Sequence, residues 1–440
     1  MDVATFVRSI FNNELPFRVE AYDGSVAEPS VISPANGITI RILRREALTR
    51  VLTHPGELGL ARAYVAGDLD VDGDLDPLFD LSVPPVNKLL KLDNLRSLLS
   101  VVGASALRPI APPSIEAKQR GALHSRSRDQ QAISHHYDVS NRFYEMVLGP
   151  SMTYSCAVFS SPDDTLEFAQ QRKVDLVARK LDLKPGTRLL DVGCGWGTMA
   201  IHAAKTYGAS VVGVTLSQQQ LSYARDQALL AGVSHLVEFR LQDFRDVSDG
   251  PFDAICSIGM SEHVGRRSLA SYTQTLFNLL RPGGRFLNHA IGRPASFDAD
   301  PDPSRAQEMS RQVQIALGMR GPSKNGSAFI DRYVFPDGEL HEVGTLVSMF
   351  QGHGFEVRHL ESLREHYALT LRYWVDNLAK RFDEAVEEVG VQRARVWRLY
   401  MSGSAVGFER RHLEIHQILC VRPIDGSSEL PLRPDFSASF

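Results

Sequence analysis

The sequence has few cysteines, no excess of positive charge and no long apolar run at its start. Its 440 residues include 4 cysteines and no Cys-x-x-Cys pair, which argues against a disulfide framework and against a zinc site. A formal net charge of -4 argues against a strongly basic protein that binds nucleic acid. Residues 1–15 mix charged and apolar side chains, so they predict neither a signal peptide nor a spanning helix. We therefore expect a cytoplasmic globular protein without metal or nucleic acid.

The most informative segment is 189–197, where an apolar run passes into an acidic residue and alternating glycines. The apolar residues predict a buried strand, and 198–207 has the spacing of a helix. A glycine-rich turn between a strand and a helix is typical of a crevice that binds a nucleoside cofactor. The turn contains Asp191, Gly193, Cys194, Gly195, Trp196 and Gly197.

The spacing of these glycines distinguishes between two classes of cofactor. A dinucleotide site requires Gly-x-Gly-x-x-Gly and an acidic residue about 20 positions later, which binds the ribose hydroxyls. Here the pattern is Gly-x-Gly-x-Gly, and the next predicted strand, 210–214, is followed by Thr215. The pattern therefore favours S-adenosylmethionine over a nicotinamide cofactor.

Strand and helix patterns alternate through the middle of the chain. Further strands are predicted at 210–214, 237–241, 252–258 and 285–291, with a helix at 217–231, a loop at 259–265 and a turn at 281–284. This alternation predicts an α/β fold with a doubly wound, Rossmann-like sheet of the class I methyltransferase kind. Ligands of such sheets bind beyond the carboxyl ends of the strands. The residues expected to face this crevice are Asp191, Thr215, Asp243, Glu262 and His289.

The chain divides near residue 120. Residues 1–120 predict a smaller α+β domain and linker that associates with lipid or membrane, 121–423 the catalytic domain, and 424–440 a flexible tail. Within the first part, 86–102 has the pattern of a basic amphipathic helix, which can lie on an anionic membrane. An ordinary helix that faces a core, followed by a solvated linker, is an equal alternative.

Several motifs together resemble the cyclopropane fatty acid synthase family, whose members use S-adenosylmethionine to add a methylene bridge across a cis double bond of a lipid acyl chain. They extend over residues 129–423 in the family's order, and their combination is specific although each alone is not. The motifs are His-Tyr-Asp-Val-Ser-Asn at 136–141, Thr-Tyr-Ser-Cys at 153–156, the glycine turn, Val-Thr-Leu-Ser at 214–217 with Gln220, Met-Ser-Glu-His-Val-Gly at 260–265, Phe-Pro-Asp-Gly at 335–338 and His-Tyr at 366–367.

The resemblance implies a set of residues that bind the cofactor. They are Tyr154, Ser155, Asp191, Gly193, Cys194, Gly195, Trp196, Gly197, Thr215, Leu216, Gln220, Gln242 and Asp243. It also implies that a bound bicarbonate ion, rather than a side chain, is the general base. The residues that correspond to its binding site are Cys156 and Ile291 through their backbone amides, and Glu262, His289 and Tyr367 through their side chains.

Two further predictions concern the neighbourhood of this anion. Ser404 replaces a cysteine that many members of the family have, and a hydroxyl can bind an anion but cannot supply a thiolate. A carbocation intermediate favours aromatic walls without nucleophilic oxygen. The candidates for such walls are Tyr137, Phe143, Tyr144, Tyr333 and Phe335.

The resemblance implies the transfer of a methylene group from S-adenosylmethionine to the cis double bond of an unsaturated phospholipid acyl chain. The product would be a cyclopropane fatty acid, and the alternative is a methylene- or methyl-branched chain. Long members of the family act on membrane phospholipids, so we expect peripheral association with the inner face of the membrane. Two other functions stay open as alternatives, a methyltransferase of a small metabolite and a noncatalytic lipid-binding protein. A homodimer stays open as well.

Overall fold

The structure is a computed structural model, and it describes residues 1–54, 56–81, 103, 108–117, 125, 126, 128, 139–295 and 327–437. Contacts divide the chain into two compact units. The first comprises Met1–Lys118, Ser327–Val334 and Phe382–Val406, and the second comprises Gln119–Gly326, Phe335–Arg381 and Gly407–Phe440. The sequence-based division assigned 327–334 and 382–406 to the catalytic domain, whereas both belong to the first unit. The predicted helix at 86–102 lies outside the described residues.

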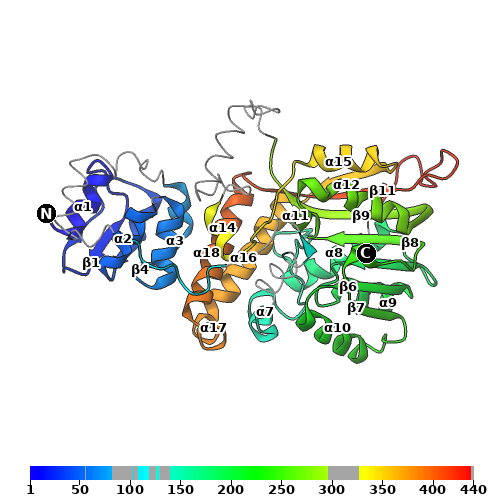
Figure 1. Cartoon of the computed structure of the whole chain (residues 1–440), viewed down its shortest axis with the longest axis horizontal. Coiled ribbons are helices and arrows are strands. Elements are labelled where there is room, and N and C mark those ends of the chain that lie inside the picture. The colour runs from blue at the N-terminus through cyan, green and yellow to red at the C-terminus, as the bar shows by residue number, and fades with distance from the viewer. Residues whose placement is uncertain are drawn as a thin grey trace. The chain divides into compact units, whose positions relative to one another are not determined.

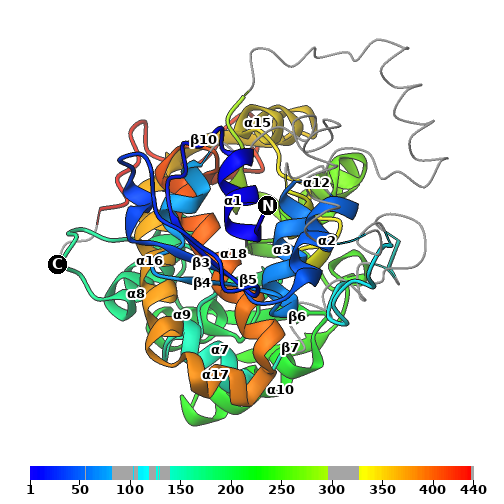
Figure 2. The ribbon, with the colours of Figure 1, turned by 90° about the vertical axis from the view of Figure 1, so that its left-hand side faces the viewer.

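The first unit contains a small sheet with strand order β2-β1-β3-β4 and helices packed against it (Figure 2). Its elements are α1 (Val3–Ile10), β1 (Arg18–Ala21), β2 (Val26–Ala27), β3 (Thr39–Ile42), α2 (Arg45–Thr53), α3 (Glu57–Ala66), β4 (Leu69–Asp72), α14 (Ala328–Tyr333), α17 (Phe382–Val389) and most of α18 (Val391–Glu409). The first unit also contains an acidic stretch that begins at residue 70. It lies partly in β4, because Val71 is buried and pairs with Ile40 of β3.

The second unit is built on a sheet with strand order β10-β11-β9-β8-β5-β6-β7 (Figure 1). The strands are β5 (Arg188–Val192), β6 (Ser210–Thr215), β7 (Val237–Leu241), β8 (Phe252–Ile258), β9 (Leu280–Gly292), β10 (Glu356–Ser362) and β11 (Glu414–Val421). The neighbouring strands β9, β8, β5, β6 and β7 are parallel to one another. Strand β11 lies between β9 and β10 and is antiparallel to both. The predicted α/β, doubly wound fold is confirmed, and its strand order reverses between β5 and β8.

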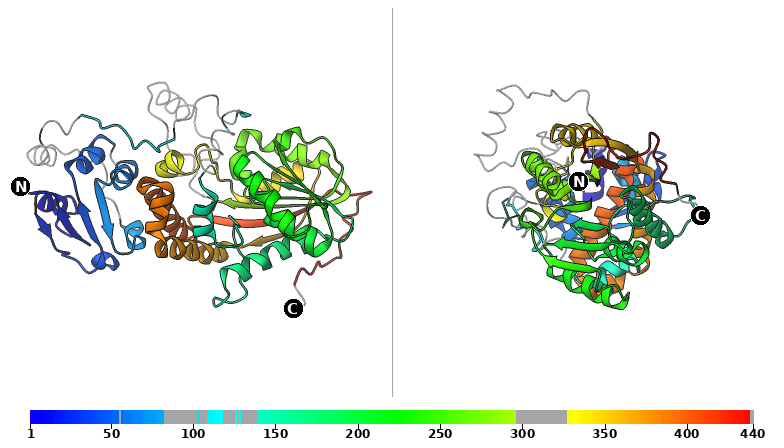
Figure 3. Two further views of the ribbon diagram at one scale, coloured as in Figure 1. Left: turned by 90° about the horizontal axis from the view of Figure 1, so that it is seen from below. Right: turned by 90° about the vertical axis from the view of Figure 1, so that its right-hand side faces the viewer.

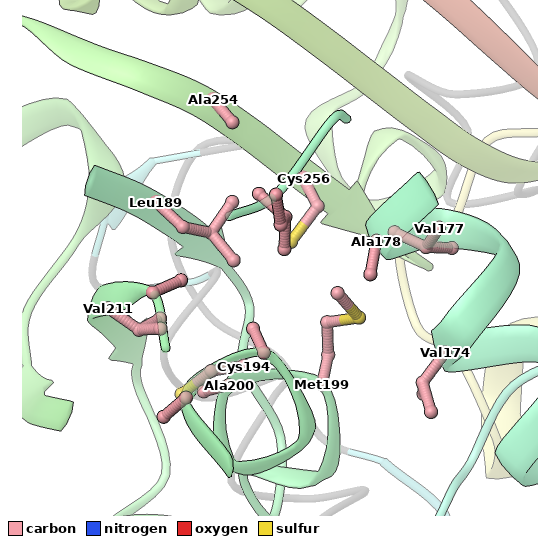
Figure 4. Packing of buried hydrophobic residues seen from close by; sticks show 14 of the residues in the cluster. Val174, Val177, Ala178, Leu189, Cys194, Met199, Ala200, Val211, Ala254 and Cys256 are labelled. Carbon is pink, nitrogen blue, oxygen red and sulfur yellow. The ribbon is translucent and has the colours of Figure 1, made fainter. Parts of the chain in front are cut away.

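Helices cover both faces of this sheet (Figure 3). They include α7 (Asn141–Leu148), α8 (Leu166–Lys180), α9 (Thr198–Tyr207), α10 (Gln218–Leu230), α11 (Ser261–Val264), α12 (Leu269–Leu279), α15 (Val343–Gly352) and α16 (Arg364–Lys380). Successive side chains of a strand point to opposite faces. Leu189 accordingly packs with side chains of α8 and α9, as Figure 4 shows, whereas Leu190 belongs to the cluster that contains α12 and α15.

Three local features differ from the sequence-based expectations. The predicted turn at 281–284 lies inside β9, whose pairing with β8 shifts register between Phe252 and Ala254. The predicted loop at 259–265 contains the short helix α11. Phe436, in the tail expected to be flexible, packs against the core of the second unit, and its carbonyl accepts a hydrogen bond from Arg179. In the part of the chain that is described, no helix is long and apolar enough to cross a membrane.

Candidate active site

A cavity of about 230 Å³ lies at the carboxyl ends of β5, β6 and β8, where the strand order reverses. A doubly wound sheet binds its ligand at this position, because the loops that follow neighbouring strands diverge there. Of the residues that the sequence assigned to the cofactor, all except Gly197 line this cavity. The structure thus brings together residues from four separate motifs, and their binding of a cofactor stays a prediction.

The three glycines of the turn have different physical roles. Gly193 has a φ of +76°, and a Cβ there would lie 2.5 Å from Cγ and Sδ of Met260, so a side chain is excluded. Gly195 lines the cavity and has no atom within 4 Å of its Cβ position, so bare backbone is open to a ligand. A Cβ on Gly197 would instead lie 2.7 Å from the ring of Phe239, which makes this glycine a packing requirement.

Two buried groups of opposite charge border the cavity. Oδ1 of Asp191 accepts a hydrogen bond from the Cys256 thiol at 3.2 Å, whereas its Oδ2 is buried without a hydrogen-bond partner among the described residues. Burial raises the pKa of Asp191 to about 6. Lys173 donates from Nζ to Oγ of Ser155 at 3.0 Å, and burial lowers the pKa of this lysine to about 8. An ammonium and a carboxylate on one wall fit S-adenosylmethionine, whose methionine part carries the complementary pair of charges.

Lys173 was missed by the sequence analysis. It lies on α8, and its neighbours on the buried side of that helix include Ala169, Val174 and Val177. A lysine among apolar residues at helical spacing is unusual, because an unpaired charge is costly to bury. That position was the available signal in the sequence.

The polar residues after β6 and β7 are already held by protein groups. The hydroxyl of Thr215 donates to Oε1 of Gln220 at 2.8 Å, and Ser217 caps α10. Both carboxylate oxygens of Asp243 accept hydrogen bonds from Arg245, at 2.8 Å from Nε and 2.5 Å from Nη2. Burial would raise the pKa of Asp243, but these hydrogen bonds lower it. A carboxylate has about four acceptor positions, so Asp243 retains the capacity to accept from a ligand.

Aromatic side chains form one wall of the cavity. The ring of Tyr144 lies 4.6 Å from that of Trp196 and 5.9 Å from that of Tyr154, measured between centroids. Tyr154 and Trp196 line the cavity, and Tyr144 is fully buried behind them. Among the other predicted aromatic walls, Tyr333 lies in the first unit, where its hydroxyl donates to Glu116. Tyr137 lies outside the described residues.

Three of the residues predicted to bind bicarbonate lie next to this cavity without lining it. The backbone amide of Ile291 donates to Oε1 of Glu262 at 2.6 Å, and Oε2 of Glu262 is buried without a partner among the described residues. Burial raises the pKa of Glu262 to about 7. The amide of Ile291 was expected to bind the anion directly, but Glu262 already occupies it. His289 pairs with Ile258, a cavity residue, and its Nε2 has no partner in the described part of the chain.

The other predicted anion ligands are positioned by the start of α16. The thiol of Cys156 lies 3.6 Å from the carbonyl of Leu363, which directly precedes this helix, and Tyr367 follows one turn later. Burial raises the pKa of the Cys156 thiol, so it stays protonated and is not a nucleophile. Ser404 lies on α18 in the first unit, and its predicted role stays a prediction.

Comparisons with known proteins agree with this geometry. A family model described as mycolic acid cyclopropane synthetase matches residues 124–418. A probable fatty acid methyltransferase of Mycobacterium tuberculosis is 44% identical over 95% of this chain and 94% of its own length. The cyclopropane-fatty-acyl-phospholipid synthase of Escherichia coli K12 is 30% identical over 88% of each chain.

Two solved structures resemble about two thirds of this chain. The cyclopropane synthase MmaA2 of Mycobacterium tuberculosis has a TM-score of 0.58 at 30% identity, and covers 68% of this chain and 99% of its own. The mycolic acid cyclopropane synthase CmaA1, in complex with SAH and CTAB, has a TM-score of 0.57 at 31% identity, and covers 66% of this chain and 97% of its own.

Proposed function

Because the chain belongs to the mycolic acid cyclopropane synthetase family, we propose that it forms cyclopropane fatty acids from unsaturated phospholipid acyl chains. It is an S-adenosylmethionine-dependent methyltransferase of the group that modifies lipid double bonds. The observation that carries the finer proposal is a pair of buried polar atoms, Oε2 of Glu262 and Nε2 of His289, which have no hydrogen-bond partner among the described residues and lie near the glycine-lined cavity.

The cofactor supplies the carbon that is added, from the methyl group on its sulfonium. Lys173 and Asp191 are placed to bind the carboxylate and ammonium of its methionine part, and the backbone at Gly195 leaves room for the nucleoside. These contacts fix the position of the cofactor, which matters because an alkene is a weak nucleophile and must be held against the reacting carbon.

The chain also has to exclude water from the reacting carbons. Tyr154 and Trp196 line the cavity, and the faces of aromatic rings can stabilise positive charge without reacting with it. Their packing against Tyr144 and Trp374 keeps this wall rigid. A rigid aromatic wall suits a reaction in which charge develops on the acyl chain.

We assign Glu262 and His289 to the binding of bicarbonate. The bound anion would supply a base for the proton that leaves the added carbon. Nε2 of His289 can donate a hydrogen bond to such an anion, and Oε2 of Glu262 can accept its proton. With a pKa of about 7, Glu262 gains and loses protons near neutral pH, as a proton acceptor at that position requires.

Two observations support a phospholipid substrate. The family model begins at residue 124, and the solved cyclopropane synthases MmaA2 and CmaA1 cover about two thirds of this chain. The phospholipid synthase of Escherichia coli instead covers 88% of it. The second observation is the sequence 86–102, which contains Lys88, Lys91 and Arg96, and these positive charges would be attracted to an anionic membrane. Replacing these three residues with glutamine should weaken vesicle sedimentation at low salt, and unchanged sedimentation would remove the membrane role.

The test of the function is incubation with S-adenosylmethionine and vesicles that contain cis-monounsaturated phospholipids, followed by mass spectrometry of the acyl chains. We expect a gain of one CH₂ per double bond, in a product that resists mild hydrogenation. Vesicles with saturated chains are the control. A product that takes up hydrogen would indicate a methylene branch, and no gain with folded protein would defeat the lipid proposal. Removing bicarbonate from the buffer should lower turnover, and adding it back should restore turnover.

A further inference from the structure

A buried series of hydrogen bonds from Lys180 through Gln417 ends at Nδ1 of His289. The other ring nitrogen, Nε2, has no partner among the described residues. Nζ of Lys180, on α8, lies 2.7 Å from Oε1 of Gln417, on β11. Nε2 of Gln417 lies 3.0 Å from Nδ1 of His289, on β9. All three residues are at most 1% exposed. Nothing in the proposed function uses Lys180 or Gln417, although burying a lysine is costly.

The chemistry of each group fixes the direction of these hydrogen bonds. An ammonium can only donate, so the oxygen of the Gln417 amide must face Lys180. The amide nitrogen then faces His289, and an NH₂ group can only donate as well. Nδ1 of His289 must therefore accept, which requires that it carry no proton. In a neutral imidazole the proton then resides on Nε2, the nitrogen that has no partner in the described part of the chain.

We propose that Lys180, acting through Gln417, is a positioning residue that holds His289 neutral with its proton on Nε2. His289 is then a permanent hydrogen-bond donor at the active site and does not take up the proton that leaves the substrate. The inference rests on the proposed function only in that the partner of this donor is the bound anion. The tautomer of His289 itself follows from the hydrogen bonds of Gln417 with Lys180 and His289.

The charges around His289 favour the same state. Burial lowers the pKa of His289 well below its usual value, and the cations Lys173 and Lys180, together with His416, lower it further. Gln417 carries no charge and so gives no support to an imidazolium. The charge of Lys180 is balanced by Glu361, whose side chain is 36% exposed and accepts from Nζ at 2.5 Å. The positive charge of Lys180 is thus balanced by a partly exposed carboxylate, while its Nζ still orients the amide of Gln417.

The tautomer can be measured directly by nitrogen NMR of protein labelled with ¹⁵N-histidine. The signals of His289 are assigned by their loss in the His289→Asn variant. We expect a protonated Nε2 and an unprotonated Nδ1 throughout about pH 5 to 8, the range in which ordinary histidines change charge. A protonated Nδ1 in the unaltered protein would overturn the inference, and this measurement needs no substrate.

The hydrogen bonds from Lys180 through Gln417 to His289 are called the relay here, and two variants test their role. In Gln417→Glu a carboxylate replaces the amide and can only accept, so Nδ1 should become protonated. In Lys180→Met the amide is free to rotate, so part of the population should move its proton to Nδ1. The matched control is Glu361→Gln, which removes the charge partner of Lys180 but keeps its hydrogen bond to Gln417, and there the tautomer should not change. An unchanged tautomer in both Gln417→Glu and Lys180→Met would overturn the role of the relay.

The same variants separate positioning from general structural support. Lys180→Met should lower turnover while leaving the KM for S-adenosylmethionine unchanged, because the relay does not line the cofactor cavity. A wrong histidine tautomer can cost up to about 10⁴-fold in turnover in other enzymes, so a loss of about 10²-fold or more is expected for Gln417→Glu. The loss in Lys180→Met should be smaller, in proportion to the fraction of molecules whose tautomer changes. Equal changes in turnover and KM would indicate a structural role and would overturn the inference. If the lipid assay fails while the tautomer is as described, the proposed function is wrong and the relay stands.

Discussion

The Glu262→Gln variant should be more stable than the unaltered protein at alkaline pH and equally stable at acid pH. The cause is the burial of a carboxyl group that retains one hydrogen bond, from the amide of Ile291. Burial disfavours the charged form, so the pKa of Glu262 is raised from 4.5 to about 7. Glutamine has nearly the same shape and can accept the same hydrogen bond, but it carries no charge to bury.

The direction and size of the effect follow from proton linkage. Below pH 4.5 the carboxyl group is neutral in both the folded and the unfolded chain, so it costs nothing. As the pH rises from 4.5 to about 7, the unfolded chain loses its proton and the folded chain keeps it, so stability falls. Above about 7 the loss is complete. One pH unit is worth about 1.4 kcal/mol, so the full loss is about 3 kcal/mol.

The assay is urea unfolding of both proteins at a series of pH values from about 4.5 to 8, a window that spans the pKa of Glu262 in the unfolded and the folded chain. The difference in free energy of unfolding between variant and unaltered protein should grow across this window and then level off. The matched control is Glu145→Gln, the same substitution at an exposed position on α7. A difference for Glu262→Gln that does not change with pH would refute the reasoning.

Three other predictions concern the cofactor cavity. Gly193→Ala should abolish binding of S-adenosylmethionine in a calorimetric titration, since its Cβ would collide with Met260, whereas Gly344→Ala, in open space on α15, should bind normally. Gly197→Ala should lower the melting temperature more than it lowers cofactor affinity, because its Cβ would meet the core rather than the ligand. The pH profile of kcat/KM for the cofactor should be bell-shaped, rising through about 7 as Glu262 ionises and falling through about 8 as Lys173 loses its proton. Lys173→Met should remove the alkaline limb, and a profile unchanged by this substitution would contradict the role of the lysine.

Local patterns were sufficient to predict the fold of the second unit. The strand at 189–192 and the helix at 198–207 appear almost residue for residue as β5 and α9, because the run of apolar residues and the glycine turn specify both within a short segment. Asp191, Thr215 and Asp243 could be assigned to the cavity from the pattern, since the carboxyl ends of parallel strands meet at one edge. Tyr154, Ser155, Gln220 and Gln242 were instead implied by the resemblance to the family.

Contacts between distant segments could not be predicted in this way. Lys180, Gln417 and His289 lie far apart in the chain, and only the insertion of β11 between β9 and β10 brings the last two side by side. The hydrogen bond from the amide of Ile291 to Glu262 also joins distant segments, and the sequence analysis expected this amide to bind the anion instead. The division of the chain into units differed too, because a helical pattern at 382–406 does not say which core the helices join.

Burial is the common cause of the unusual chemistry at this site. Asp191 and Glu262 each have one carboxylate oxygen held by a protein donor and the other buried without a partner among the described residues. Burying such a group lowers the stability of the folded chain unless a ligand completes its hydrogen bonds. A ligand that does so removes this cost, which favours its binding. The two acids differ in their surroundings: Asp191 shares a cavity with Lys173, whereas Glu262 accepts from the amide of Ile291, two residues after His289 on β9. The first environment suits a ligand with both charges, and the second suits a small anion whose proton Glu262 can accept.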